Sequence, residues 1–138
     1  MSDDTYVFLV PQRSILNSNQ RLHHMEAHRR RNDLRFMGAE AWFKALHIDD
    51  KEPMASAECT ALVKFPTGHR RDANNWWPTA KSIIDGMVGG HKHLRFNQGI
   101  LPDDDSSKLI GPDMRVEHDR SVPKGYVEVN LVFTGRPL

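Results

Sequence analysis

Residues 59–65, Cys-Thr-Ala-Leu-Val-Lys-Phe, decide the fold class of this chain. Every second side chain falls on the same face of an extended backbone, so one face of this stretch is almost entirely apolar and the other is mixed. This alternation predicts a β-strand whose apolar face packs in a core. Pro66 and Gly68 end the strand, and the polar residues 69–75 should follow it as a loop.

Helices are predicted on both sides of this strand. After the loop, Ala80, Ile83, Ile84, Met87 and Val88 have helical spacing, which predicts a helix over about 76–88 that closes at Gly89-Gly90, with Asn75 as its N-cap. Before the strand, an apolar stripe predicts an amphipathic helix over 25–47. The stripe consists of Leu34, Met37, Ala41 and Ala45, with Trp42 beside it.

Three further strands are expected at the two ends of the chain, over residues 6–10, from 109 to at least 116, and 126–133. Turn residues at 122–125 predict that the last two strands form a hairpin. The order β-α-β-α-β-β predicts an α+β fold, a small mixed sheet covered by helices, in one domain spanning residues 1–138.

The composition narrows the possible functions. Nineteen Lys and Arg residues against 18 Asp and Glu give a net charge of +1, so attraction to nucleic acid has to come from local clusters. The lone cysteine, Cys59, excludes an internal disulfide and a multi-cysteine metal site. No run of about 18 apolar residues and no basic-then-apolar leader occurs. We therefore expect a cytoplasmic protein without a membrane partner.

Two short segments could carry chemistry: residues 69–75, His-Arg-Arg-Asp-Ala-Asn-Asn, and 101–106, Leu-Pro-Asp-Asp-Asp-Ser. If the two loops meet, Asp72 and one or two of the aspartates 103–105 could hold Mg²⁺, which prefers oxygen ligands. A helix start just after Asp72 would also favour phosphate. This combination indicates a metal-dependent enzyme that cuts phosphodiesters.

Each of these signals also has a structural explanation. A run of aspartates after proline is typical of a solvated turn, an aspartate before a helix is typical of a cap, and Lys81 with Asp85 is typical of a surface ion pair at (i, i+4) spacing. Arg70-Arg71 is usually a solvated pair. The eight histidines lack the ligand spacing of a zinc site.

The motif Arg-Arg-Asp-Ala-Asn-Asn at 70–75, the helix with Lys81 and Asp85, and Gly-Ile-Leu-Pro-Asp-Asp-Asp-Ser at 99–106 together resemble the RusA family of Holliday-junction resolvases, in particular the bacteriophage versions. The resemblance implies a RusA-like fold and a homodimeric, Mg²⁺-dependent endonuclease, with Mn²⁺ as a possible substitute. Such an enzyme nicks branched DNA at four-way junctions in pairs during recombination, repair or phage DNA processing. A phage-encoded enzyme would act in the bacterial host cytoplasm.

By position, the resemblance implies catalytic roles for Asp72, Asp104, Asp105 and Lys81, and a metal site formed by Asp72, Asn74, Asp104 and Asp105. Asn74 departs from the family pattern, which has a second aspartate there, and three extra residues separate Asp72 from Lys81. The loss of one negative charge leaves a second possibility open: a catalytically weakened or inactive branched-DNA-binding protein of the same fold.

Basic residues would supply sequence-independent phosphate contacts in either case. The expected DNA-binding residues are Arg70, Arg71, Arg29, Arg30, Arg31 and Lys92. Lys92 lies in the segment 89–98, which is longer than the family's usual short turn. This segment is either a DNA-contacting loop or a solvated insertion.

Overall fold

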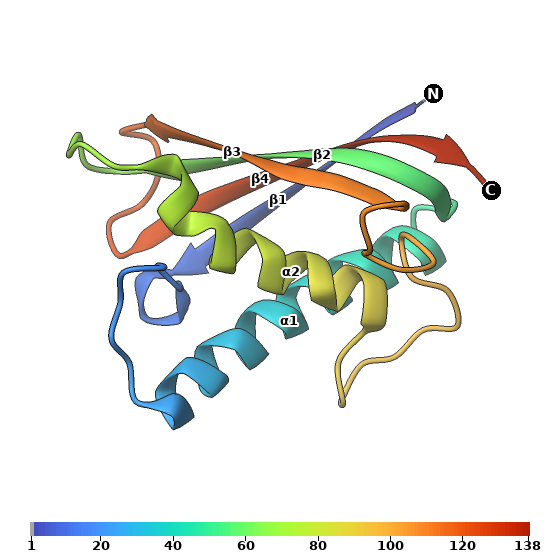
Figure 1. Ribbon diagram of the computed structural model, residues 1–138, viewed down its shortest axis with the longest axis horizontal. Coiled ribbons are helices and arrows are strands. Elements are labelled where there is room, and N and C mark those ends of the chain that lie inside the picture. The colour runs from blue at the N-terminus through green and yellow to red at the C-terminus, as the bar shows by residue number, and fades with distance from the viewer. Residues whose placement is uncertain (1) are drawn as a thin grey trace.

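The computed structural model describes residues 2–138 as a four-stranded sheet with two α-helices and two short 3-10 helices. In chain order the elements are β1 (Ser2–Pro11), η1 (Gln12–Ser14), α1 (His24–His47), β2 (Met54–Phe65), η2 (Ala73–Trp76), α2 (Trp77–Gly89), β3 (Leu109–His118) and β4 (Tyr126–Pro137). Both helices lie on the same side of the sheet (Figure 1). The predicted class, a mixed α+β fold with a small sheet covered by helices, is therefore confirmed.

The predicted hairpin of the last two strands is wrong. The sheet order is β1-β4-β2-β3, so β2 lies between β3 and β4, parallel to the former and antiparallel to the latter. The connection crosses the end of β2, where the Asp119 N–H donates to the Phe65 carbonyl at 2.8 Å. β4 pairs with β1 on one side and with β2 on the other, and its alternate residues from Val127 to Phe133 are fully buried under the helices.

The core lies between the helices and the inner face of the sheet. On β2, Cys59, Ala61, Val63 and Phe65 point into it, as the alternating sequence predicts, and Trp42 of α1 is completely buried. The predicted helices differ from α1 and α2 by only a residue or so at their ends. The first strand begins earlier than predicted, because its polar outward residues still pair with β4.

The two helices cross at two glycines. A Cβ on Gly38 would lie 1.9 Å from the Ile83 carbonyl oxygen, and one on Gly86 would lie 1.9 Å from the Arg35 carbonyl oxygen. Glycine is a poor helix former, but position 38 requires it because the two backbones approach too closely there for any side chain. The close crossing fixes α2, which carries Lys81, against α1.

Among the described residues, neither helix is both long enough and apolar enough to pass through a lipid bilayer.

Candidate functional site

Three charged side chains meet on the exposed side of α2. The Lys81 ammonium lies 2.5 Å from Asp85 Oδ1 and also contacts Asp104 Oδ2. Lys81 and Asp85 are one helical turn apart, whereas Asp104 comes from the loop before β3. The side chains are partly buried, with 22%, 33% and 32% of Lys81, Asp85 and Asp104 exposed. The cluster therefore joins two distant parts of the sequence at a place that solvent reaches.

The electrostatics of this cluster differ between its two carboxylates. Hydrogen bonding from Lys81 lowers the pKa of Asp104, which favours the ionised form of this carboxylate. Burial raises the pKa of Asp85; Lys81 opposes that rise and the neighbouring Asp104 adds to it. Burial lowers the pKa of Lys81, but its bonds to Asp104 and Asp85 outweigh burial and the net pKa is raised. Two carboxylates thus share one positive charge.

Only one of the three consecutive aspartates reaches this cluster. The Asp103 carboxylate accepts the Asp104 backbone N–H at 2.7 Å. The Asp105 carboxylate accepts the backbone N–H of Ser107 at 2.8 Å and its hydroxyl at 2.5 Å, which lowers the pKa of Asp105. Asp103 and Asp105 therefore stabilise the turn, and Asp104 is the one that points at α2.

Asp72 and Asn74 lie at the start of η2. The Asp72 carboxylate accepts the Asn74 N–H at 3.1 Å and caps this short helix, and both residues are exposed. The prediction of Asn75 as the N-cap of the following helix is wrong, because Asn75 lies inside η2, which runs directly into α2. The cap moves upstream since the four-residue 3-10 turn adds helical backbone before Trp77.

The four predicted metal ligands do not form one cluster. Parallel pairing of β2 and β3 places the loop after β2 and the loop before β3 at opposite ends of the two strands. Figure 1 shows these loops at the left and right of the molecule, with α2 between them. Residues 2–138 contain no group of three or more His, Cys, Asp or Glu side chains placed to hold a metal ion. Asp104 is brought to Lys81, but Asp72 and Asn74 are not.

Two carboxylates nevertheless fit one cation. The Lys81 ammonium already occupies the place where Asp85 and Asp104 converge, so it marks where positive charge is stable. Mg²⁺ is often bound in proteins by only one or two carboxylates together with water and substrate phosphates. An ion at this position would compete with Lys81 for both carboxylates.

Asp85 was not among the predicted metal ligands. Its (i, i+4) spacing from Lys81 predicts an ion pair, which the structure confirms. The resemblance puts Lys81 and Asp104 in one site, but spacing along the chain does not predict that Asp104 and Asp85 contact the same ammonium.

The arginines near Asp72 are placed differently. Arg70 is exposed. Arg71 lies over the Phe65 ring, with its guanidinium carbon 3.8 Å from the ring centroid, and donates to the Thr67 and His69 carbonyls; burial lowers its pKa. Arg71 therefore shapes the loop after β2, and Arg70 is the freer of the two to meet a ligand.

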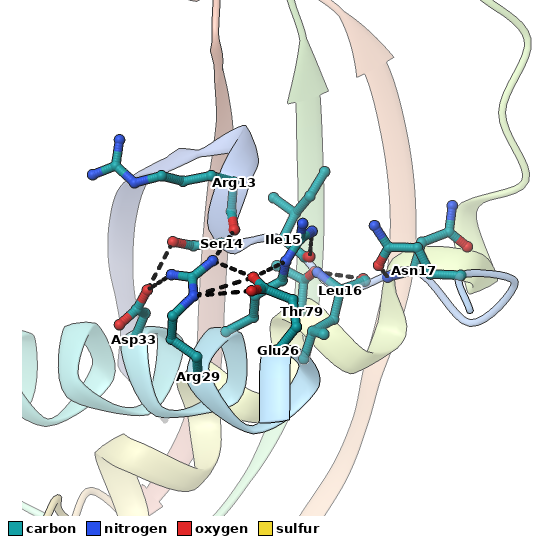
Figure 2. Close-up of polar contacts among 11 residues, drawn as sticks. Arg13, Ser14, Ile15, Leu16, Asn17, Glu26, Arg29, Asp33 and Thr79 are labelled. Atoms are coloured by element: carbon teal, nitrogen blue, oxygen red, sulfur yellow. Dashed lines mark hydrogen bonds and ion pairs between the residues drawn. The ribbon is translucent and has the colours of Figure 1, made fainter. Parts of the chain in front are cut away.

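Arg29 and Arg30 hold the loop that follows η1. Figure 2 shows Arg29 between Glu26, Asp33 and the Arg13 carbonyl, and Arg30 donates to Glu26 and to the Ile15 carbonyl at 2.9 Å. Their charges are balanced locally. Arg31 and Lys92, by contrast, are exposed and form no ion pair within residues 2–138.

The same loop also contacts the start of α2. The Leu16 N–H donates to Thr79 Oγ1 at 2.8 Å, and the Thr79 hydroxyl donates back to the Leu16 carbonyl at 2.7 Å (Figure 2). The Ser18 N–H donates to the Asn75 carbonyl. The polar loop is therefore fixed beside the segment that carries Asp72 and Asn74.

No protein-family model matches the chain, and no curated protein matches its sequence.

Proposed function

We propose that the protein is a Mg²⁺-dependent, structure-selective endodeoxyribonuclease of the RusA type, which resolves four-way DNA junctions by paired nicks. The motifs at 70–75 and 99–106, together with Lys81, suggest this activity. The observation that supports it best is the meeting of Asp104, from the acidic motif, with Lys81 and Asp85 on α2. A simple solvated turn would not need its middle aspartate to reach a helix lysine.

In this proposal Asp104 of the loop before β3 and Asp85 of α2 hold the ion, and Asp105 follows Asp104 on that loop. Bound Mg²⁺ would polarise a phosphate oxygen and make an attacking water more acidic. Lys81, displaced from the carboxylates by the ion, is then available to stabilise negative charge on the phosphate. Burial raises the pKa of Asp85, so metal binding should weaken as the pH falls toward that pKa, where protons compete with the ion for this carboxylate.

Asp72 and Asn74 have a different role in this account than in the four-ligand site. The exposed Asp72 carboxylate caps η2, which orients the loop carrying Arg70. We therefore assign the loop after β2 to DNA contact and positioning, with Arg70 facing the backbone phosphates. A homodimer, which the resemblance implies, would supply two such sites for paired nicks.

A DNA-binding protein that no longer cuts is the second candidate. It is favoured by the separation of Asp72 and Asn74 from Asp104, and by the Lys81 ammonium, which satisfies both carboxylates without a metal. Such a protein would keep the fold and the basic surface, so DNA binding does not separate the two candidates.

Cleavage separates them. A labelled four-way junction is incubated with the protein in Mg²⁺, in Mn²⁺ and in EDTA, and products are resolved on denaturing gels. The nuclease predicts paired nicks that need the metal and are lost in Asp104→Asn/Asp105→Asn. Junction binding without nicking in either metal would favour the non-cutting protein, and sedimentation of the same preparation tests the homodimer.

A further inference from the structure

A basic groove lies away from the Lys81 cluster, between α1 and the segment that follows α2. Its volume is about 580 Å³, and none of its lining residues is acidic. The polar part of the lining consists of Asn32, Arg35, His91, Lys92 and Arg95. Arg31 lies one helical turn before Arg35 on the same side of α1, so the basic character continues along the helix.

The groove is a fixed part of the fold. Arg35 Nε donates to the Gly90 carbonyl at 2.9 Å, and His91 and Leu94 exchange backbone hydrogen bonds of 2.8 and 3.0 Å that close a tight turn. The His91 ring meets Phe36 of α1 edge-on at 5.3 Å and is only 8% exposed. Lys92 therefore lies at the tip of an anchored turn, exposed to solvent.

The far end of this segment is anchored as well. Trp42 Nε1 donates to the Gln98 carbonyl at 2.8 Å, and the Ile100 N–H donates to the Met87 carbonyl at 3.0 Å. Both ends of residues 90–98 are therefore held against the helices. We interpret this segment as an ordered part of the surface rather than as a solvated insertion.

The charges in the groove are not balanced by the protein. Within residues 2–138, the ion pairs of α1 involve Arg29 and Arg30 but not Arg31 or Arg35, and Lys92 and Arg95 have no acidic partner either. The effect on a neighbouring group is visible: burial lowers the pKa of His91, and His93, Lys92 and Arg35 lower it further. An anion would relieve this repulsion.

We propose that this groove binds successive phosphates of a DNA backbone, with Lys92 and Arg95 on one wall and Arg35 on the other, and that Arg31 extends the track one helical turn beyond the groove. Several cations spaced along two facing elements suit a chain of phosphates better than a single small anion. That the nucleic acid is DNA rests on the proposed function. The contact gives affinity without base specificity, and it lies on a segment separate from the residues proposed for cleavage.

The test is the salt dependence of DNA binding. Binding of a labelled duplex is measured by fluorescence anisotropy in EDTA over a range of salt concentrations, for wild type and Lys92→Ala/Arg95→Ala. The expected slope of log K against log salt is shallower in the variant by about 1.8, about 0.9 for each of two lost phosphate contacts. Affinity at about 0.1 M salt should fall at least about tenfold.

The matched control is Lys44→Ala/Lys51→Ala. This variant removes the same two charges from exposed positions, but in a region that also holds Asp3, Asp4 and Asp49. Its slope should stay that of wild type. Equal slopes in the two double variants would overturn the proposal, because the loss would then reflect net charge alone. Displacement of the duplex by poly-glutamate at equal ionic strength, with equal affinity, would also overturn it in favour of an acidic polypeptide.

The metal-free assay keeps this inference separate from the nuclease proposal. If the protein never nicks a junction, the difference in slope still stands. If the slopes are equal while wild type nicks in Mg²⁺, only the groove assignment fails.

Discussion

The loop after β2 and the loop before β3 are alike in one respect, since the first places one aspartate and the second three aspartates beside polar residues, yet the structure uses them differently. Asp72 accepts a hydrogen bond from a residue two positions away. Asp104 reaches Lys81, 23 positions away in the sequence. The comparison shows that Asp104 is a candidate for chemistry because it contacts a side chain of another element. Asp72, by contrast, only caps a short helix.

The largest expected difference is in cleavage. Asp104→Asn should lower the rate of junction nicking at least about 10³-fold, equivalent to about 4 kcal/mol, since it removes a proposed metal ligand. Asp72→Asn should lower it by no more than about tenfold, because Asn still caps a helix. Single-turnover nicking in Mg²⁺ measures both. Equal losses would mean that the two loops act together, contrary to this comparison.

Lys81 should show opposite effects on metal binding and on cleavage. Lys81→Met removes the cation that competes for Asp85 and Asp104, so Mg²⁺ should bind more tightly. Nicking should nevertheless fall about 10²-fold, because a group that stabilises negative charge on the phosphate is lost. Calorimetric Mg²⁺ titration and nicking at saturating metal give the two quantities. Weaker metal binding in the variant would show that Lys81 supports the site rather than competes for it.

Stability should depend on pH through Asp104. Its folded pKa is below the ordinary value of 3.8, so its stabilisation is fully present above pH 3.8 and is lost as the pH falls through the folded pKa. Asp104→Asn should therefore lower the free energy of unfolding by about 1 kcal/mol at pH 7. Denaturant titrations should find this difference shrinking between pH 4 and pH 2. A control, Asp3→Asn, removes an exposed carboxylate that has no ion pair within residues 2–138, and it should lower the free energy of unfolding at pH 7 by less than Asp104→Asn does.

The smallest effect is expected at residue 74. Asn74→Asp would strengthen metal binding if this side chain were a ligand, but Asn74 lies with Asp72 and apart from Asp104. The Mg²⁺ concentration that gives half-maximal nicking should change by less than about twofold. A large decrease would place the loop after β2 at the metal.

The sequence predicts the elements well because their signals are local. Alternation at 59–65 and helical spacing around Ile83 each identify an element together with its buried face. The order of the strands is harder to predict from the sequence. The turn residues at 123–125 do bend the chain, but they do not determine which strand β4 pairs with. The pairing of β4 with both β1 and β2 is seen only in the folded sheet.

The same distinction between local and long-range signals applies to the candidate site. The pairing of Lys81 with Asp85 is local and predictable. The choice of Asp104 over Asp103 and Asp105 depends on how the loop turns, and the distance of Asp72 depends on the parallel pairing of β2 and β3. Neither is encoded in spacing along the chain, so both are learned only from the fold.

The most direct test of the central claim, that Asp85 and Asp104 rather than Asp72 and Asn74 form the cation site, is paramagnetic broadening by Mn²⁺ in backbone-amide NMR spectra. At low Mn²⁺ the account predicts that amide signals around Lys81, Asp85 and Asp104 disappear while those of residues 72–75 persist. Loss of the signals of 72–75 first, or no local broadening at either place, would contradict it.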